Sequence, residues 1–253
     1  MFVLAKTGEI PGRRAELSEM RICGVRALCI VIPSAAERKK RLLARLCRTA
    51  AENAGMRGAV SAVFSEGFSG KEFFAEAGIY EASLRPLYEK NAADIAYLAA
   101  KRHSCVSVFA GSIMDTEREV IKSLAEKFRY VTLSTGDCRT ALVRNIGMRL
   151  GASIIENNPG GMLERADAAV FFAPPRENTP LPEKCAALFL DGVRPENVTG
   201  GREIENVSFS APDFVESALP EGFCREALLS QLLVNGAFGA EEIRAASAEM
   251  SFA

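Results

Sequence analysis

The regular alternation of apolar runs and amphipathic stretches between Cys105 and Pro175 constrains the fold of this chain most strongly. Strands that alternate with helices of 10–15 residues pair in parallel through right-handed crossovers. The sequence therefore predicts an α/β fold, in which a parallel sheet is flanked by helices. The predicted strands are 105–110, 130–134, 152–156 and 168–172, and the predicted helices between them are 115–127 and 138–150.

Three regions are predicted along the 253 residues. A continuous apolar run at 27–32 is typical of a strand buried on both faces, and a helix is predicted from residue 34 to about residue 53. Amphipathic spacing at 223–234 and a short helix around 240–249 suggest that the chain ends in helices. The predicted regions are an N-terminal α/β region (1–102) packed against the sheet, the parallel sheet itself (103–212) and C-terminal helices (213–253) that fold back on the body.

The loop after the strand at 105–110 lacks the signature of a dinucleotide site. Such a site has three glycines, which let the backbone approach a pyrophosphate at the start of the next helix. Here Gly111 is the only glycine in residues 111–117, and Asp115 and Glu117 stand where the phosphates would sit. The helix end could hold an anion beside Gly111 and Ser112. We favour the alternative, in which the two carboxylates cap the helix and complement its dipole.

The ends of the other predicted strands supply further candidates for a ligand site. Open parallel sheets bind ligands outside the carboxyl ends of their strands, where the strand order reverses. An NADP site often has an arginine near the end of its second strand, and here Ser134 and Thr135 precede Arg139. Alternatively, Arg139 is a surface residue in the first turn of a helix. The candidate cofactor-binding residues are Gly111, Ser112, Ser134, Thr135, Arg139, Asn157 and Pro174.

Residues 163–175, with the sequence LERADAAVFFAPP, carry a resemblance to known families. The segment is similar to a stretch in the Rossmann domains of shikimate dehydrogenases and glutamyl-tRNA reductases, and the similarity covers roughly residues 104–192. It implies a Rossmann-like, NAD(P)-binding type of domain, in which this strand passes under the nicotinamide side of the site. The three-glycine loop and the Lys–Asp catalytic pair of shikimate dehydrogenases are missing. The whole chain resembles an uncharacterised bacterial family with a degenerate Rossmann-like domain, which implies no activity.

Composition argues against several classes of protein. The 31 basic and 32 acidic residues nearly cancel, so no general attraction to nucleic acid or to an anionic membrane is expected. The sequence has no apolar run of the roughly 20 residues that a membrane span needs. Its first residues lack the pattern of a signal peptide, so we expect a cytoplasmic location. The seven scattered cysteines predict neither a disulfide framework nor a zinc site, and no metal site is predicted.

No catalytic residue can be assigned from the sequence, and whether the chain is an enzyme stays open. His103 is the only histidine, and we expect it at the surface or at a helix end. Cys138 lies in a loop setting that favours a reactive thiol, although an ordinary loop cysteine is the preferred interpretation.

Three hypotheses for function follow. The leading one is a Rossmann-like protein that binds a small metabolite or nucleotide at the strand ends, without conventional dinucleotide chemistry. The second is an NADP-type oxidoreductase that holds its cofactor with Ser112, Ser134, Thr135 and Arg139. The third is a non-catalytic interaction or scaffold protein, whose ancestral site is filled by its own side chains. The sequence leaves open the ligand and whether the chain forms a homo-oligomer.

Overall fold

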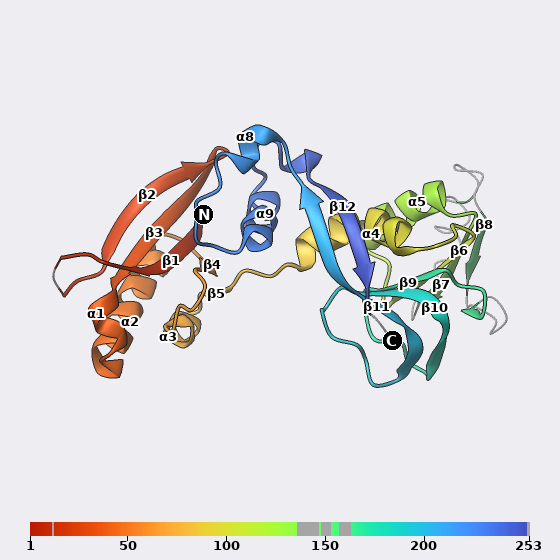
Figure 1. Ribbon diagram of the computed structural model, residues 1–253, viewed down its shortest axis with the longest axis horizontal. Helices are drawn as coiled ribbons and strands as arrows, with labels where there is room; N and C mark the ends of the chain where they lie inside the picture. Colours follow the sequence, from red (N-terminus) through yellow and green to blue (C-terminus); the bar gives the residue numbers. More distant parts are fainter. Residues whose placement is uncertain (12, 136–146, 148–152, 157–162, 252–253) are drawn as a thin grey trace. The chain divides into compact units, whose positions relative to one another are not determined.

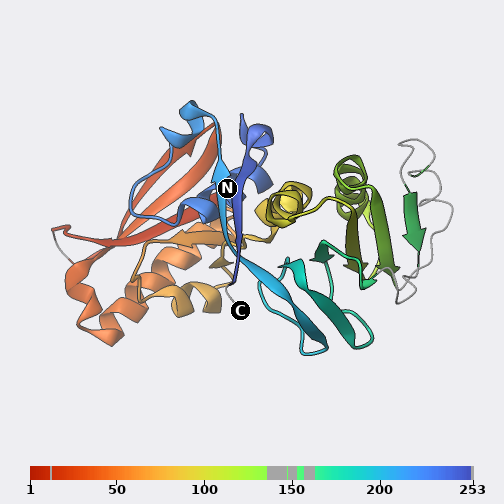
Figure 2. The same ribbon diagram turned by 45° about the vertical axis from the view of Figure 1, so that its right-hand side comes forward.

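The computed structural model describes residues 1–11, 13–135, 147, 153–156 and 163–251. These residues form two sheets, one of five strands and one of seven (Figures 1 and 2). The chain divides into two compact units. The first comprises Met1–Leu87 and Ala211–Ile243, and the second comprises Tyr88–Ser210 and the residues from Arg244 onward. In the described part of the chain, no helix has the length and apolar character needed to cross a membrane.

The first unit is a mixed sheet with helices packed on it. Its strands are β1 (Phe2–Gly8), β2 (Glu16–Ile22), β3 (Val25–Pro33), β4 (Ser61–Phe64) and β5 (Tyr80–Glu81), in the order β2-β3-β1-β4-β5. β2 and β3 form an antiparallel hairpin, and the other neighbours pair in parallel. Its helices are α1 (Ser34–Glu37), α2 (Lys40–Met56), α3 (Lys71–Glu76), α8 (Asp213–Glu216), α9 (Arg225–Val234) and the 3-10 helix η1 (Ala240–Glu242).

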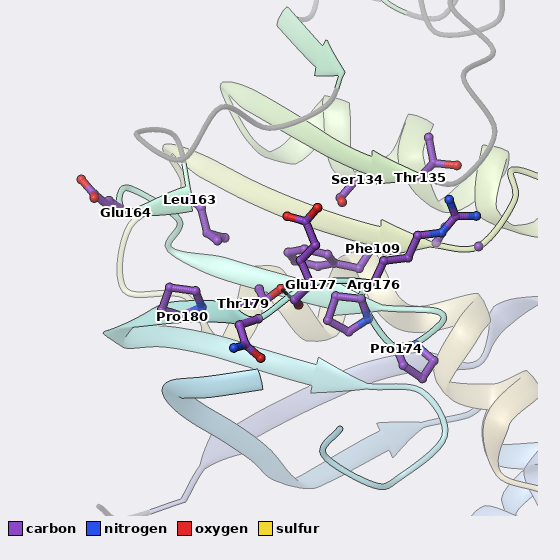
Figure 3. Close-up of a pocket in the computed structure, with 14 residues that line it drawn as sticks. Phe109, Ser134, Thr135, Leu163, Glu164, Pro174, Arg176, Glu177, Thr179 and Pro180 are labelled. Atoms are coloured by element: carbon purple, nitrogen blue, oxygen red, sulfur yellow. Dashed lines mark hydrogen bonds between the residues drawn. The ribbon is translucent and has the colours of Figure 1, made fainter. Parts of the chain in front are cut away.

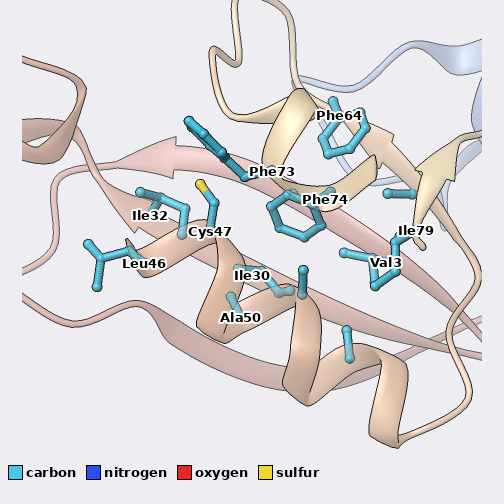
Figure 4. Close-up of a cluster of buried hydrophobic side chains, with 14 of the residues drawn as sticks. Val3, Ile30, Ile32, Leu46, Cys47, Ala50, Phe64, Phe73, Phe74 and Ile79 are labelled. Carbon is cyan, nitrogen blue, oxygen red and sulfur yellow. The ribbon is translucent and has the colours of Figure 1, made fainter. Parts of the chain in front are cut away.

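The core of the first unit joins the sheet to α2 and α3 (Figure 4). The apolar run predicted as a buried strand is β3, and its Ile30 is fully buried. Leu46, Cys47 and Ala50 recur at three- and four-residue spacing on α2, which places them on one face of the helix, and all three are buried. Phe74 of α3 is also fully buried, so α3 closes the core over β3 and β4.

The second unit contains the predicted parallel sheet. Its strands are β6 (Cys105–Ala110), β7 (Tyr130–Thr135), β8 (Ser153–Glu156), β9 (Ala168–Phe171), β10 (Thr179–Phe189), β11 (Val198–Ser210) and β12 (Arg244–Met250). Every pairing from β6 to β11 is parallel, whereas β12 runs antiparallel to β11. The helices α4 (Arg85–Ala99) and α5 (Asp115–Lys127) are joined by the ion pair between Lys127 and Asp94, with an N–O distance of 2.9 Å.

The strand order confirms the Rossmann-like fold. The sheet has the order β12-β11-β10-β9-β6-β7-β8. If the parallel strands β6 to β11 are renumbered 1 to 6 along the chain, their order in the sheet is 6-5-4-1-2-3. This is the doubly wound Rossmann order, 3-2-1-4-5-6, read from the other edge. The chain leaves β6 toward β7 on one side and later enters β9 on the other side. The reversal of direction between β6 and β9 creates the position where such folds bind ligands.

Some elements differ from the sequence-based predictions. The helix predicted around 240–249 is wrong, because beyond the short η1 these residues form β12, which pairs with β11. Its sequence, RAASAEM, favours a helix by propensity, and pairing with a neighbouring strand overrides that preference. The predicted helix at 34–53 is divided in two, because Lys39 has non-helical backbone angles (φ −131°, ψ 84°). The two compact units divide the chain after Leu87 and before Ala211, and the last strand belongs to the second unit. The predicted regions 1–102, 103–212 and 213–253 stay a prediction.

Candidate ligand site at the strand ends of the second unit

A cavity of about 590 Å³ lies at the position where the strand order of the second unit reverses (Figure 3). The carboxyl end of β6 contributes Phe109 and Ala110, and the end of β7 contributes Ser134 and Thr135. Residues 174–180, which comprise the loop after β9 and the first two residues of β10, form the opposite side. The geometry therefore places a cavity where open α/β sheets bind their ligands.

Phe109 forms the floor of the cavity and belongs to an aromatic stack. The ring of Phe109 lies parallel to that of Phe171, with 4.5 Å between ring centroids and an interplanar angle of 4°. Phe171 also stacks on Phe189, with a centroid distance of 4.8 Å. The three side chains come from β6, β9 and β10, which are neighbours in the sheet, and they pack with Leu163, Leu181 and Val198. This floor is apolar and held in place by the pairing of its strands.

The rim of the cavity is polar. Ser134 and Thr135 present hydroxyl groups from the end of β7, and Arg176 and Glu177 reach over the cavity from the loop after β9 (Figure 3). In Figure 3 the Arg176 side chain extends toward Thr135, and the Glu177 carboxylate points toward the Ser134 side. Both charged side chains are exposed. The Arg176 guanidinium forms neither an ion pair nor a hydrogen bond with the part of the chain that the structure describes.

The loop that carries Arg176 is fixed by Asn197, which precedes β11. Asn197 Nδ2 donates to the carbonyl oxygens of Pro175, at 2.5 Å, and of Glu177, at 3.3 Å. The Thr179 hydroxyl donates to the same Glu177 carbonyl, at 3.0 Å. These bonds hold the backbone on both sides of Arg176, so its side chain projects from an anchored loop and not from a free one.

The start of α5 does not fit a pyrophosphate. Gly111 has no unusual backbone angle, and a Cβ atom added to it would meet only Ala173 Cβ, at an ordinary 3.9 Å. The predicted cap by Glu117 is present, because its carboxylate accepts a hydrogen bond from the Met114 backbone N–H, at 3.1 Å. Asp115 instead pairs with Arg118, with an N–O distance of 2.7 Å. The Glu117 carboxylate therefore already caps the helix end that a pyrophosphate needs, whereas Asp115 does not cap it as predicted.

The structure brings four of the seven predicted site residues together. Gly111, Ser134, Thr135 and Pro174 line the cavity, while Ser112 follows Gly111 in the chain but does not appear in the lining. Arg139 and Asn157 lie outside the described residues, so their predicted roles stay predictions. The strand-end rule selects the loop at 173–176 from the sequence, but neither Arg176 in it nor Glu177 beside it was named as a candidate. The signal was available, because both follow the strand predicted at 168–172, whose end the switch-point rule selects.

Neither His103 nor a metal cluster adds a catalytic group to this cavity. His103 precedes β6, at the opposite end of the strand from the cavity, and its ring stacks on Tyr97 with a centroid distance of 3.8 Å. Its Nε2 lies 3.0 Å from the Tyr97 carbonyl oxygen. Among the described residues, no three His, Cys, Asp or Glu side chains gather as they would to hold a metal ion. Cys138 lies outside the described residues.

Three buried thiols give the chain a predictable response to alkaline pH. Burial raises the pKa of Cys47 and Cys185 to about 12 and that of Cys105 to about 11, with added contributions from Glu72 and Asp167. The unfolded chain releases these protons near pH 9, whereas the folded chain keeps them. Stability is therefore expected to fall as the pH rises from about 9 toward 11.

Urea unfolding midpoints of the wild type and Cys185→Ala at a series of pH values test this prediction, since the variant should lose less stability across that range. Equal losses would contradict it, and Cys224→Ser, at an exposed cysteine, is the control.

No family model and no curated protein matches this sequence. Several solved structures of NAD-bound proteins are similar in fold. One is the Δ1-pyrroline-2-carboxylate reductase of Thermococcus litoralis in complex with NADH and L-proline, with 11% identity over 42% of this chain and 36% of that chain and a TM-score of 0.33. Another is the iminosuccinate reductase of Paracoccus denitrificans in complex with NAD+, with 16% identity over 42% of this chain and 35% of that chain and a TM-score of 0.31.

Quinate dehydrogenase from Corynebacterium glutamicum in complex with NAD matches with 10% identity over 74% of this chain and 79% of that chain, with a TM-score of 0.33. The present chain spans about a third of the length of the first two structures. These three proteins are two reductases and a dehydrogenase. TM-scores this far below 0.5 carry no argument about activity, so the assignment of the fold depends on the strand order of the chain itself.

Proposed function

We propose that the second unit binds a small anionic metabolite or nucleotide in the cavity between the ends of β6 and β7 and the loop at 174–180. One observation supports this function most directly. An exposed arginine, Arg176, extends over a cavity at the switch point of the sheet and has no ionic partner in the described part of the chain. As far as the described residues go, its guanidinium can receive an anionic group.

The dimensions and lining of the cavity suit a small molecule. Its volume of about 590 Å³ falls within the roughly 300–1,000 Å³ of typical ligand pockets. Such pockets combine an apolar surface with a few polar groups that fix the orientation of the ligand. Here the Phe109 ring supplies the apolar surface, and Arg176, Ser134 and Thr135 supply the polar groups. An open, polar-rimmed cavity of this kind argues against the scaffold hypothesis, in which the site is filled.

The start of α5 argues for an unconventional binding mode. A nicotinamide dinucleotide is one member of the proposed ligand class, but Glu117 already accepts the Met114 N–H at that helix end. The anionic group of the ligand would instead contact Arg176, with the hydroxyl groups of Ser134 and Thr135 as additional donors. Binding of NADP through Arg139 remains a proposal, since Arg139 lies outside the described residues.

Thermal unfolding of the full chain with AMP, ATP, NAD, NADP and the reduced dinucleotides tests this proposal. A ligand at 100 times its Kd adds about 2.7 kcal/mol of stability, which produces a clear shift in melting temperature. We expect at least one of these anions to shift the melting temperature. Arg176→Gln should weaken its binding about tenfold or more, because a hydrogen bond to a charged group is worth roughly 1.5–3 kcal/mol.

Arg102→Gln is the matched control for this variant. Arg102 is exposed in the same unit and precedes β6, so it lies at the opposite end of that strand from the cavity. The control should bind the ligand as the wild type does. The proposal is wrong if none of the six compounds binds at millimolar concentration, or if Arg176→Gln and Arg102→Gln bind equally well.

A further inference from the structure

The first unit contains a second cavity, of about 480 Å³, at the β2–β3 hairpin. The hairpin contributes Arg21, Cys23 and Arg26, and the segment after α9 contributes Asn235 and Phe238. None of the described residues that line this cavity is acidic. This cavity belongs to a different unit from the site described above and is independent of the function proposed for it.

Two like charges stand directly opposite each other at this cavity. Arg21 of β2 is the cross-strand partner of Arg26 of β3. Directly opposite residues have Cβ atoms about 4.5–5.5 Å apart and point to the same face of the sheet, and like charges in this position destabilise the pair. Both arginines are exposed, and neither guanidinium has an ion-pair partner within the described ranges. The nearest acidic residue of β2 on the same face, Glu19, is already paired with Arg57 at 2.6 Å.

The turn of the hairpin is also strained. Cys23 has a φ of 48° and is the only non-glycine residue with a positive φ in the described chain. It is followed by Gly24, with a φ of 85°. Two successive positive φ angles define a type I′ turn, whose first position is normally Asn, Asp or Gly. The positive φ of Cys23 costs free energy, and a hydrogen bond from the following segment helps to hold this conformation. The Cys23 carbonyl oxygen accepts this bond from the Phe238 backbone N–H, at 3.2 Å. Strain of this kind often occurs at functional sites.

Phe238 gives the cavity an aromatic surface. Its side chain is 75% exposed, which is unusual for a large apolar residue. The bond to Cys23 fixes its backbone against the hairpin, and its ring lies 5.4 Å from that of Phe214. A fixed and exposed ring beside two arginines presents a stacking surface next to two cations.

We propose that this cavity binds a phosphate monoester of a small molecule that carries a flat ring, such as a nucleoside monophosphate. A phosphate monoester carries a charge of about −1.5 to −2 at neutral pH, which matches the two arginine charges. The planar guanidinium group binds pairs of phosphate oxygens, so two of them on one face can share a single phosphate. The ring of the ligand would stack on Phe238. Binding would remove the repulsion between Arg21 and Arg26.

Calorimetric titration of the full chain with AMP, inorganic phosphate and adenosine tests the proposal. Every protein in the titration, the control included, carries Arg176→Gln as well, so that binding at the cavity of the second unit is weakened equally in all of them. We expect AMP to bind more tightly than phosphate, and adenosine to bind weakest. Arg21→Gln and Arg26→Gln should each weaken AMP about tenfold or more. Phe238→Ala should weaken AMP but leave phosphate unchanged.

Arg45→Gln is the control for the titration, because Arg45 is exposed on α2 of the same unit and does not line the cavity.

A measurement of thermal stability provides a second test. At low ionic strength without phosphate, Arg26→Gln should melt at a higher temperature than the wild type, and saturating phosphate should abolish this difference. The proposal is overturned if AMP binds Arg26→Gln and Arg45→Gln equally well, or if adenosine binds as tightly as AMP. It is also overturned if a phosphotyrosine peptide binds more tightly than AMP, which would indicate a protein partner.

Discussion

Replacing Phe171 by alanine is expected to lower the free energy of unfolding of the second unit by about 3–5 kcal/mol. Phe171 is only 3% exposed and lies between the rings of Phe109 and Phe189. Its neighbours belong to paired strands on either side, β6 and β10, so the sheet cannot close around the space that the ring leaves. Because Phe109 forms the floor of the candidate site, the same substitution should also weaken ligand binding there.

Urea unfolding followed by circular dichroism measures this effect, with Val193→Ala as the control. Val193 lies between β10 and β11 and is 72% exposed, so removing its methyl groups should change stability by less than about 0.5 kcal/mol. If Phe171→Ala costs no more than Val193→Ala, the aromatic stack is not a structural element of this sheet.

The elements that the sequence predicts well are those with strong local patterns. The predicted strand at 105–110 and helix at 115–127 have the bounds of β6 and α5. A continuous apolar run and a helical repeat are both visible within about ten residues, so no distant contact is needed to recognise them. The candidate residues could be chosen in the same way, because the rule for parallel sheets points to the carboxyl ends of the predicted strands.

The elements that the sequence did not predict depend on distant contacts. β11 contains Gly200, Gly201 and several charged residues, and its strand conformation comes from pairing with β10 on one side and β12 on the other. The loop that carries Arg176 contains two prolines and two charged residues, as an exposed linker would. Only the bonds from Asn197, some twenty residues further along the chain, turn it into one wall of a cavity. Such contacts leave no periodic signal in the sequence.

Substituting Gly200 by alanine is expected to destabilise the second unit by about 2–5 kcal/mol. Gly200 has a φ of +66°, in the left-handed region where a side chain costs roughly 1–2 kcal/mol. A Cβ atom would also lie 2.3 Å from the carbonyl oxygen of Leu181, its pairing partner on β10. A backbone atom in a paired strand cannot move aside cheaply, so a further cost of about 1–3 kcal/mol follows from overpacking. Thr179 and Pro180 begin the same strand and line the candidate cavity, so ligand binding should fall as well.

Gly192→Ala separates the two causes of this loss. Gly192 has a similar φ of +71°, but an added Cβ atom would meet nothing within 4 Å. The control therefore carries the left-handed penalty without the collision, and we expect it to cost about 1–2 kcal/mol. Urea unfolding of both variants measures the difference. Equal losses of stability would mean that β10 moves away from the new methyl group. That movement would displace Thr179 and Pro180 from the cavity wall, so Gly200→Ala should then bind the ligand far more weakly than Gly192→Ala.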